Sequence, residues 1–286
     1  MTARELFNTT QQSLQSLYPQ HEAKTIVEWL FCGVLKLKNR IALYENIDKI
    51  IPEQTQTIIQ RKLKRLQQFE PIQYVLHKAW FMNLELYVSA DVLIPRPETE
   101  ELCQTLFNEV KLANANILDL ATGSGCIAIA LKKTNPNWEV TATDICPSAL
   151  KLSNCNALRH KVNINFVFDD MLHSSLIHAK KQFDIIVSNP PYIPISEKKI
   201  MRPNVTNYEP SIALFVPDQD PLLFYRAIAQ IAEECLHPNG YIYMEVHENY
   251  ANKTKAFFES KNWNTKIYFD INEKPRFIKA QKNGRL

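Results

Sequence analysis

Apolar positions in the first seventy residues recur at helical spacing. One stripe comprises Ile26, Trp29, Leu30, Val34 and Leu35, and a second comprises Ile58, Ile59, Leu63 and Leu66. Such spacing places each set on one face of a helix. Pro52 precedes the second stripe and suits a helix start. The pattern predicts a small bundle of three to five helices over residues 1–72.

The pattern changes between residues 73 and 97. Short apolar runs at 74–76 and 84–88 are typical of strands and predict a connecting β-hairpin. Pro95 and Pro97 then interrupt any helix, and Thr99 with Glu100 suits the first turn of a new one.

From residue 98 to residue 286 we expect a single α/β domain. The predicted strands are 116–120, 139–144, 164–168, 184–188 and 241–246, with two more near 265–269 and 276–280. Helical stretches separate them, and this alternation is typical of a doubly wound, mostly parallel sheet.

The composition is that of an ordinary globular protein with a packed core. Of 286 residues, 45% are hydrophobic, and the net charge of +3 is too small to argue for polyanion binding. The six cysteines are scattered without a C-x-x-C pair, so we expect reduced thiols in a cytoplasmic protein and no zinc. No apolar run approaches 18 residues, which disfavours secretion and membrane spanning. The cluster Arg61, Lys62, Lys64 and Arg65 is interpreted as a solvated helix face, with a contact to RNA or an acidic partner as the alternative.

Glycine is scarce, which makes its positions informative. The chain has five glycines where average usage predicts about 20. Gly123 and Gly125 lie in a strand–turn–helix segment, where a missing Cβ lets a ligand approach the backbone and a helix N-terminus offers N–H groups. The spacing fits neither the dinucleotide fingerprint nor a phosphate-binding P-loop.

Acidic residues follow the next two strands. Asp144 lies 21 residues after Gly123 and suits the two ribose hydroxyls of an adenosine-containing ligand. Asp170 is predicted to accept from the adenine amino group, and Met171 to cover the ring. A solvated loop acid is the alternative for Asp170.

The fourth strand ends in Asn189-Pro190-Pro191-Tyr192, at the sheet edge where open α/β folds bind ligands. Two prolines remove N–H donors, so the Asn189 side-chain oxygen and the Pro190 carbonyl remain as acceptors for a planar –NH₂ group. Tyr192 offers a flat face. Holding a poorly nucleophilic nitrogen in line with a sulfonium methyl would lower the barrier to methyl transfer.

With the glycine turn and the Asn-Pro-Pro-Tyr segment, the chain resembles class I S-adenosylmethionine-dependent methyltransferases of the N-P-P-Y type. It resembles the release-factor glutamine methyltransferases more closely. The closer resemblance is carried by Pro71–Tyr74, Leu93–Glu100, Asp119–Gly125, Ser188–Ile193, Tyr208–Pro210, Ala213–Phe215 and Pro238–Gly240. It implies a Rossmann-like, mostly parallel seven-stranded sheet with an N-terminal helical domain that engages the protein substrate. It also implies methylation of the glutamine side-chain nitrogen in a Gly-Gly-Gln loop.

The resemblance further implies site roles. The predicted cofactor site comprises Ala121, Thr122, Gly123, Ser124, Gly125, Asp144, Asp170, Met171 and Asn189. The predicted substrate site comprises Asn189, Pro190, Pro191 and Tyr192, of which Asn189, Pro190 and Tyr192 are the predicted catalytic residues. S-adenosylhomocysteine would be the product, without a metal. We expect a monomer that binds release factors and neither nucleic acid directly nor membranes.

Three positions depart from the family pattern. Ala121, His77 and Val216 stand where glycine is usual. Alanine is acceptable at 121 if its φ is negative, and the other two changes are expected to be neutral drift in connectors. The alternatives to the leading function are glutamine methylation of a ribosomal protein, adenine amine methylation of DNA or RNA, and a non-catalytic binding module.

Overall fold

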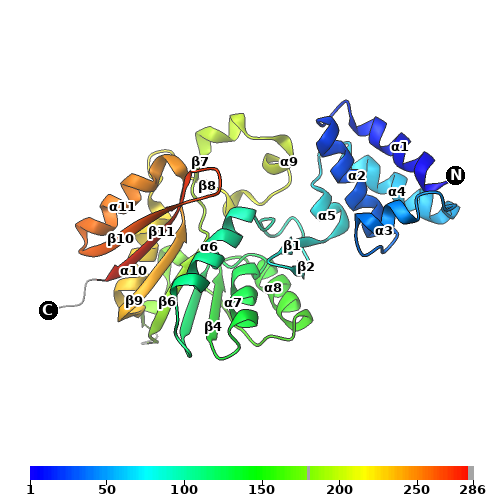
Figure 1. Cartoon of the computed structure of the whole chain (residues 1–286). Helices are drawn as coiled ribbons and strands as arrows, with labels where there is room; N and C mark the ends of the chain where they lie inside the picture. Colours follow the sequence, from blue (N-terminus) through cyan, green and yellow to red (C-terminus); the bar gives the residue numbers. More distant parts are fainter. Residues whose placement is uncertain (179–180, 283–286) are drawn as a thin grey trace. The chain divides into compact units, whose positions relative to one another are not determined.

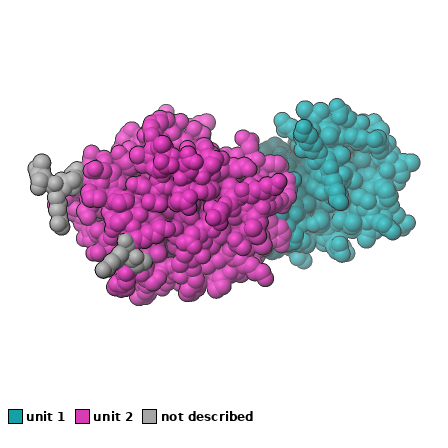
Figure 2. Space-filling view, turned by 90° about the horizontal axis from the view of Figure 1, so that it is seen from below, with its two compact units in different colours: residues 1–78, 202–208 teal, residues 79–201, 209–286 magenta. Residues whose placement is uncertain are grey.

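The computed structural model describes residues 1–178 and 181–282, so Gly284 lies outside the described part. The chain divides into two compact units (Figure 2): unit 1 comprises residues 1–78 and 202–208, and unit 2 comprises residues 79–201 and 209–286. The predicted first boundary at residue 72 therefore lies six residues early, because α5 (Ile72–Leu76) packs with unit 1. Across the described residues, no helix combines the length and apolar character needed to cross a bilayer.

Unit 1 is helical, as its apolar periodicity predicts. Within the fully described residues 1–78 it contains α1 (Ala3–Leu14), α2 (Gln20–Val34), α3 (Arg40–Glu45), α4 (Glu53–Leu66) and α5 (Figure 1). Their inward faces share one core that includes Leu30, Ile59 and Leu66, all with no exposed surface. Pro52 is the N-cap of α4, as predicted. The short helix α9 (Pro203–Thr206) also belongs to this unit.

The predicted strand at 74–76 is wrong, since these residues form part of α5. A three-residue apolar run suits either a strand or one helical turn, and packing decides between them. Ile72 and Val75 are buried in the helical core, one turn apart. The connecting hairpin begins later, with β1 (Ala79–Phe81) paired antiparallel to β2 (Leu84–Leu86).

Two of the four basic residues in the α4 cluster form hydrogen bonds within unit 1. The Lys62 ammonium donates to the Val75 carbonyl. The Arg65 guanidinium forms two hydrogen bonds with the Glu70 carboxylate, of 2.6 and 2.5 Å. Only Arg61 and Lys64 of the four are exposed. This favours the interpretation of a solvated helix face over a dense surface for RNA.

Unit 2 is built on a seven-stranded sheet of order β10-β11-β9-β6-β3-β4-β5 (Figure 1). The strands are β3 (Asn116–Leu120), β4 (Glu139–Asp144), β5 (Asn165–Phe168), β6 (Phe183–Ser188), β9 (Leu236–Glu245), β10 (Trp263–Phe269) and β11 (Pro275–Lys282). The pairs from β9 to β5 are all parallel, and β11 runs antiparallel to both of its neighbours. The predicted strands and the mostly parallel α/β sheet are confirmed.

Alternate residues of the central strands enter two separate apolar layers. Ile117 and Ile185 pack on one face of the sheet with α6 (Pro97–Glu109), α7 (Cys126–Thr134) and α8 (Pro147–Arg159). Leu118 and Ile186 pack on the other face with α10 (Leu223–Cys235) and α11 (Ala251–Ser260). Because both faces are covered, the strands read as continuous apolar runs. The loops at the strands' carboxyl ends remain free to build a site.

Candidate active site

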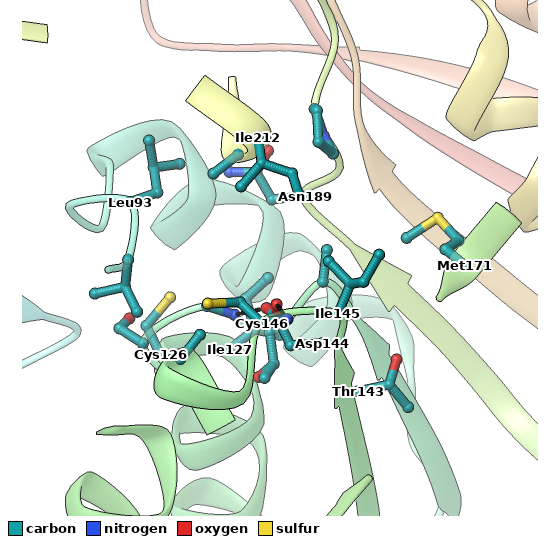
Figure 3. Close-up of a pocket in the computed structure, with 18 of the residues that line it drawn as sticks. Leu93, Cys126, Ile127, Thr143, Asp144, Ile145, Cys146, Met171, Asn189 and Ile212 are labelled. Atoms are coloured by element: carbon teal, nitrogen blue, oxygen red, sulfur yellow. Dashed lines mark hydrogen bonds between the residues drawn. The ribbon is translucent and has the colours of Figure 1, made fainter. Parts of the chain in front are cut away.

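The loops after β3, β4, β5 and β6 line one cavity of about 260 Å³ at the carboxyl edge of the sheet (Figure 3). The predicted site residues that line it are Ala121, Thr122, Gly123, Ser124, Asp144, Asp170, Met171, Asn189 and Pro191. Parallel strands end at the same edge, so four sequence segments meet there. Gly125, Pro190 and Tyr192 are not among the lining residues, although each adjoins one that is.

The glycine turn after β3 keeps the cavity wall open. Gly123 has a φ of +53°, and a Cβ built on it would meet no heavy atom within 4 Å. A ligand can therefore lie against its backbone. Gly125 has a φ of +80° and caps the start of α7, where a Cβ would lie 3.0 Å from that of Ser153. Gly123 therefore leaves space in the cavity, whereas Gly125 allows close packing at the start of α7.

Ala121 corrects the expectation of a negative φ at this position, because its φ is +57°. An L-residue in the left-handed region carries a steric cost of about 1–2 kcal/mol. His77 also has a positive φ, of +53°, as the C-cap of α5, which contradicts the expectation that a side chain at this position is neutral. Val216 has no positive φ and lies in the short strand β8 (Phe215–Val216).

Asp144 ties the second strand to the glycine turn. Its Oδ2 accepts from the Gly123 N–H and its Oδ1 from the Cys146 N–H, both at 2.9 Å. A carboxylate has about four acceptor positions, so capacity remains toward the cavity that Asp144 lines. Burial raises the pKa of Asp144, while these backbone bonds lower it. The geometry suits recognition of paired hydroxyls.

Asp119 lies fully buried beneath the turn. Its Oδ2 accepts from the Thr122 hydroxyl at 2.6 Å, which holds the turn to β3. Burial raises the pKa of Asp119 to about 7. The sequence offered a signal for this residue, a lone acid within an apolar strand just before the glycines.

The third segment begins with two acids of different environments. Asp169 is buried and accepts from the hydroxyls of Ser174 and Ser175, so it shapes the local turn. Asp170 caps η1 (Met171–His173) by accepting from the Leu172 N–H, and it pairs with the His173 ring at 3.0 Å. The His173 contact lowers the pKa of Asp170. Asp170 and Met171 both line the cavity, and their adenine contacts stay predictions.

Asn189, which follows β6, also lines the cavity, and its side chain is hydrogen-bonded to α6. Its side-chain nitrogen donates to the Thr99 hydroxyl at 3.0 Å. Tyr192 turns its hydroxyl to the buried Glu245 carboxylate at 2.7 Å, and its ring packs edge-on against His247 with centroids 6.0 Å apart. Burial is the main cause that raises the pKa of Tyr192 well above its usual value. Tyr192 therefore stays neutral and supports the loop.

Comparisons with known proteins show which family the sequence belongs to. Residues 97–206 match the Methyltransferase small domain family, and residues 5–76 match the PrmC N-terminal domain family. The release factor glutamine methyltransferase of Bacteroides thetaiotaomicron is 38% identical, over 95% of this chain and 97% of its own. That of Flavobacterium psychrophilum is 39% identical, over 94% of this chain and 95% of its own. The chain belongs to the release factor glutamine methyltransferase family.

Solved structures agree on the architecture. A methyltransferase from Pyrococcus furiosus superimposes with a TM-score of 0.52 and 18% identity, covering 71% of this chain and 91% of that chain. At this identity the likeness concerns the fold alone. The expected class I methyltransferase fold is confirmed by this likeness together with the family match.

In this member of the glutamine methyltransferase family, part of the Pro-Arg-Pro-Glu-Thr-Glu segment forms the cavity wall. Pro95, Arg96 and Thr99 line the cavity. The Arg96 guanidinium pairs at 2.5 Å with Glu209, whose side chain is 1% exposed. Glu209 also accepts from the Ile94 N–H at 3.2 Å, so this pair fixes the chain entering α6.

Three site residues escaped the sequence reasoning. Thr99 was assigned only to a helix start, although its hydroxyl contacts Asn189. Glu245 lies at the end of β9 and joins Thr99 to Tyr192. Ile145 follows Asp144, lines the cavity and is 40% exposed. In the sequence, an apolar residue directly after the strand-ending acid is the signal for Ile145, whereas nothing local indicates the Glu245 contacts.

Proposed function

We propose that this protein transfers a methyl group from S-adenosylmethionine to the side-chain amide nitrogen of the glutamine in the Gly-Gly-Gln loop of peptide chain release factors. Its relatives from Bacteroides thetaiotaomicron and Flavobacterium psychrophilum are release factor glutamine methyltransferases, which supports this substrate. The observation that carries the chemistry is the position of Asn189, which follows β6, lines the cavity and directly precedes Pro190.

The residues present fit this cofactor. The turn at Gly123 leaves room for a ligand against the backbone. Asp144 would accept from the two ribose hydroxyls, and the apolar side chains of Ile145 and Met171 would pack on the adenine ring. Asp170 would accept from the adenine amino group. When bound, S-adenosylmethionine supplies an electrophilic methyl group on a sulfonium.

The chain's own part in the reaction is to hold and aim the nitrogen. An amide nitrogen is conjugated and a poor nucleophile, so positioning provides much of the acceleration. The Asn189 side-chain oxygen and the Pro190 carbonyl would each accept one hydrogen of the substrate –NH₂ group. These bonds strengthen as the nitrogen becomes pyramidal and more acidic, so they stabilise the transition state more than the ground state. Pro190 and Pro191 lack N–H groups that would compete for the acceptors.

Unit 1 is proposed to engage the protein substrate. The match of residues 5–76 to the PrmC N-terminal domain family supports this assignment. The absence of a dense basic surface on α4 supports a protein partner over RNA, since Lys62 and Arg65 are engaged internally.

The test mixes the protein with methyl-labelled S-adenosylmethionine and four separate substrates. These are a release factor, its Gln→Ala variant at the Gly-Gly-Gln loop, a ribosomal protein fraction and duplex DNA. We expect label in the unaltered release factor and none in its Gln→Ala variant. Label in the ribosomal fraction or in DNA, with none in the release factor, would replace the proposal by the corresponding alternative.

A further inference from the structure

A buried carboxylate stands behind the acceptor pair. Glu245, the last residue of β9, is 1% exposed. Its Oε2 accepts from the Thr99 hydroxyl at 2.7 Å, and its Oε1 accepts from the Tyr192 hydroxyl at 2.7 Å. Both oxygens of one buried acid are therefore occupied, one by Thr99, which lines the cavity, and one by Tyr192, which follows the lining residue Pro191.

Hydrogen-bond accounting gives this contact a consequence for Asn189. A threonine hydroxyl has a single hydrogen, and that of Thr99 is donated to Glu245. The Thr99 oxygen can then only accept from Asn189, at 3.0 Å. The two ends of an asparagine amide are similar in shape, so the bonding network decides which end faces which partner. The –NH₂ end of Asn189 must face Thr99, and the Oδ1 end is left for the substrate.

We propose that Glu245 and Thr99 are positioning residues that hold the Asn189 amide with its oxygen toward the substrate nitrogen. The inference rests on the proposed function, because it assigns the orientation that a substrate –NH₂ group requires. A carboxylate can only accept hydrogen bonds, so it imposes one direction on the whole chain from Glu245 through Thr99 to Asn189. If the Asn189 amide were flipped, its –NH₂ group would face the substrate –NH₂ group, and the hydrogen bond between Asn189 and the substrate would be lost.

Substitutions at Thr99 separate orientation from packing. Thr99→Val keeps the shape and removes the hydroxyl, whereas Thr99→Ser keeps the hydroxyl and removes a methyl group. We expect Thr99→Val to lower kcat about tenfold, the worth of one hydrogen bond, and Thr99→Ser to stay within about twofold of the unaltered protein. The Kd for S-adenosylmethionine should change by less than about twofold in both. Wild-type kcat in Thr99→Val, or equal losses in the two variants, would overturn the proposal.

Glu245→Gln tests the source of the direction. Glutamine has nearly the same shape but offers an –NH₂ group to one of the two hydroxyls, which frees that hydroxyl to reverse its hydrogen. We expect a loss of kcat of about tenfold, and no further loss when Thr99→Val is added, because both changes break the same chain. Losses that multiply in the double variant would show that Glu245 acts independently of Thr99.

A readout without catalysis distinguishes failure of this inference from failure of the proposed function. The Asn189 side-chain amide is followed by ¹⁵N NMR, with its resonances identified by their loss in Asn189→Ala. We expect exchange of its hydrogens with water to be about tenfold faster in Thr99→Val than in the unaltered protein and Thr99→Ser. Equal exchange rates in all three proteins would contradict the proposed orientation. If exchange is faster in Thr99→Val as expected, but the unaltered protein methylates no release factor, only the proposed function is contradicted.

Discussion

The backbone N–H of Gly123 donates a hydrogen bond of 2.9 Å to Oδ2 of Asp144, 21 residues along the chain. The turn after β3 and the acid that ends β4 are thereby held in a fixed relation. Gly123 and Asp144 both line the cavity, so a ligand against the Gly123 backbone would also lie near the Asp144 carboxylate.

Asp144→Asn is expected to weaken S-adenosylmethionine binding. The substitution keeps the shape but removes the charge that strengthens hydrogen bonds to hydroxyls, worth about 1.5–3 kcal/mol. Calorimetric titration should show a Kd raised by at least about tenfold. Asp218→Asn is the matched control, since this exposed acid accepts from Ser196 outside the cavity lining. An unchanged Kd for Asp144→Asn would remove Asp144 from the binding site.

Asn189→Ala should abolish turnover while leaving cofactor binding largely intact. Removing a group that stabilises the transition state typically costs about 10²–10³ in kcat. Single-turnover methylation and equilibrium binding, measured on the same preparation, separate the two effects. Asn137→Ala serves as the control, because Asn137 is exposed and precedes β4 at the other edge of the sheet. Equal loss of binding and turnover in Asn189→Ala would assign Asn189 to the cofactor alone.

Ala121→Gly is expected to stabilise the protein by about 1 kcal/mol. Glycine adopts the φ of +57° without the steric cost that alanine carries there. The free energy of unfolding in urea provides the measurement. Ala130→Gly is the matched control in α7, where glycine should instead destabilise by about 1 kcal/mol. Destabilisation in both variants would mean that residue 121 is not strained.

Arg96→Met should destabilise unit 2 by about 3 kcal/mol. It leaves the Glu209 carboxylate buried and without its cationic partner, and the Ile94 N–H still donates to it. The control is Arg159→Met, which breaks the ion pair between Arg159 and Glu85. The Arg159 side chain is 52% exposed, so this change should lower the free energy of unfolding by about 1 kcal/mol or less. Chemical denaturation of both variants compares the buried and exposed pairs directly, and equal losses would contradict the role of burial.

Stability should depend on pH through Asp119. Burial raises its pKa from 3.8 to about 7, so the folded state binds the proton more tightly than the unfolded state. The stabilisation from this proton is full below pH 3.8 and is lost as pH rises through about 7. Between pH 5.5 and pH 8, the free energy of unfolding should fall more in the unaltered protein than in Asp119→Asn. Parallel pH profiles would show that Asp119 does not titrate in this range.

The sequence alone determined the element types and the outline of the site. Apolar periodicity located α2 and α4 within a helical bundle and the seven strands of unit 2, because the spacing of apolar residues along the chain differs between helices and strands. The carboxyl ends of parallel strands share one edge, so the sequence predicts residues 121–125, Asp144 and Asn189 at one site, and all of them except Gly125 line the cavity.

Only the tertiary structure decided the rest. Whether 74–76 was helix or strand depended on the core that buried it, and the φ of Ala121 depended on the loop that enclosed it. The contact of Thr99 with Glu245 joins positions 146 residues apart, and that of Asn189 with Thr99 joins positions 90 apart. Side-chain partners at such separations are determined by packing and burial, which favour a partner for most buried polar groups and leave no periodic pattern in the sequence.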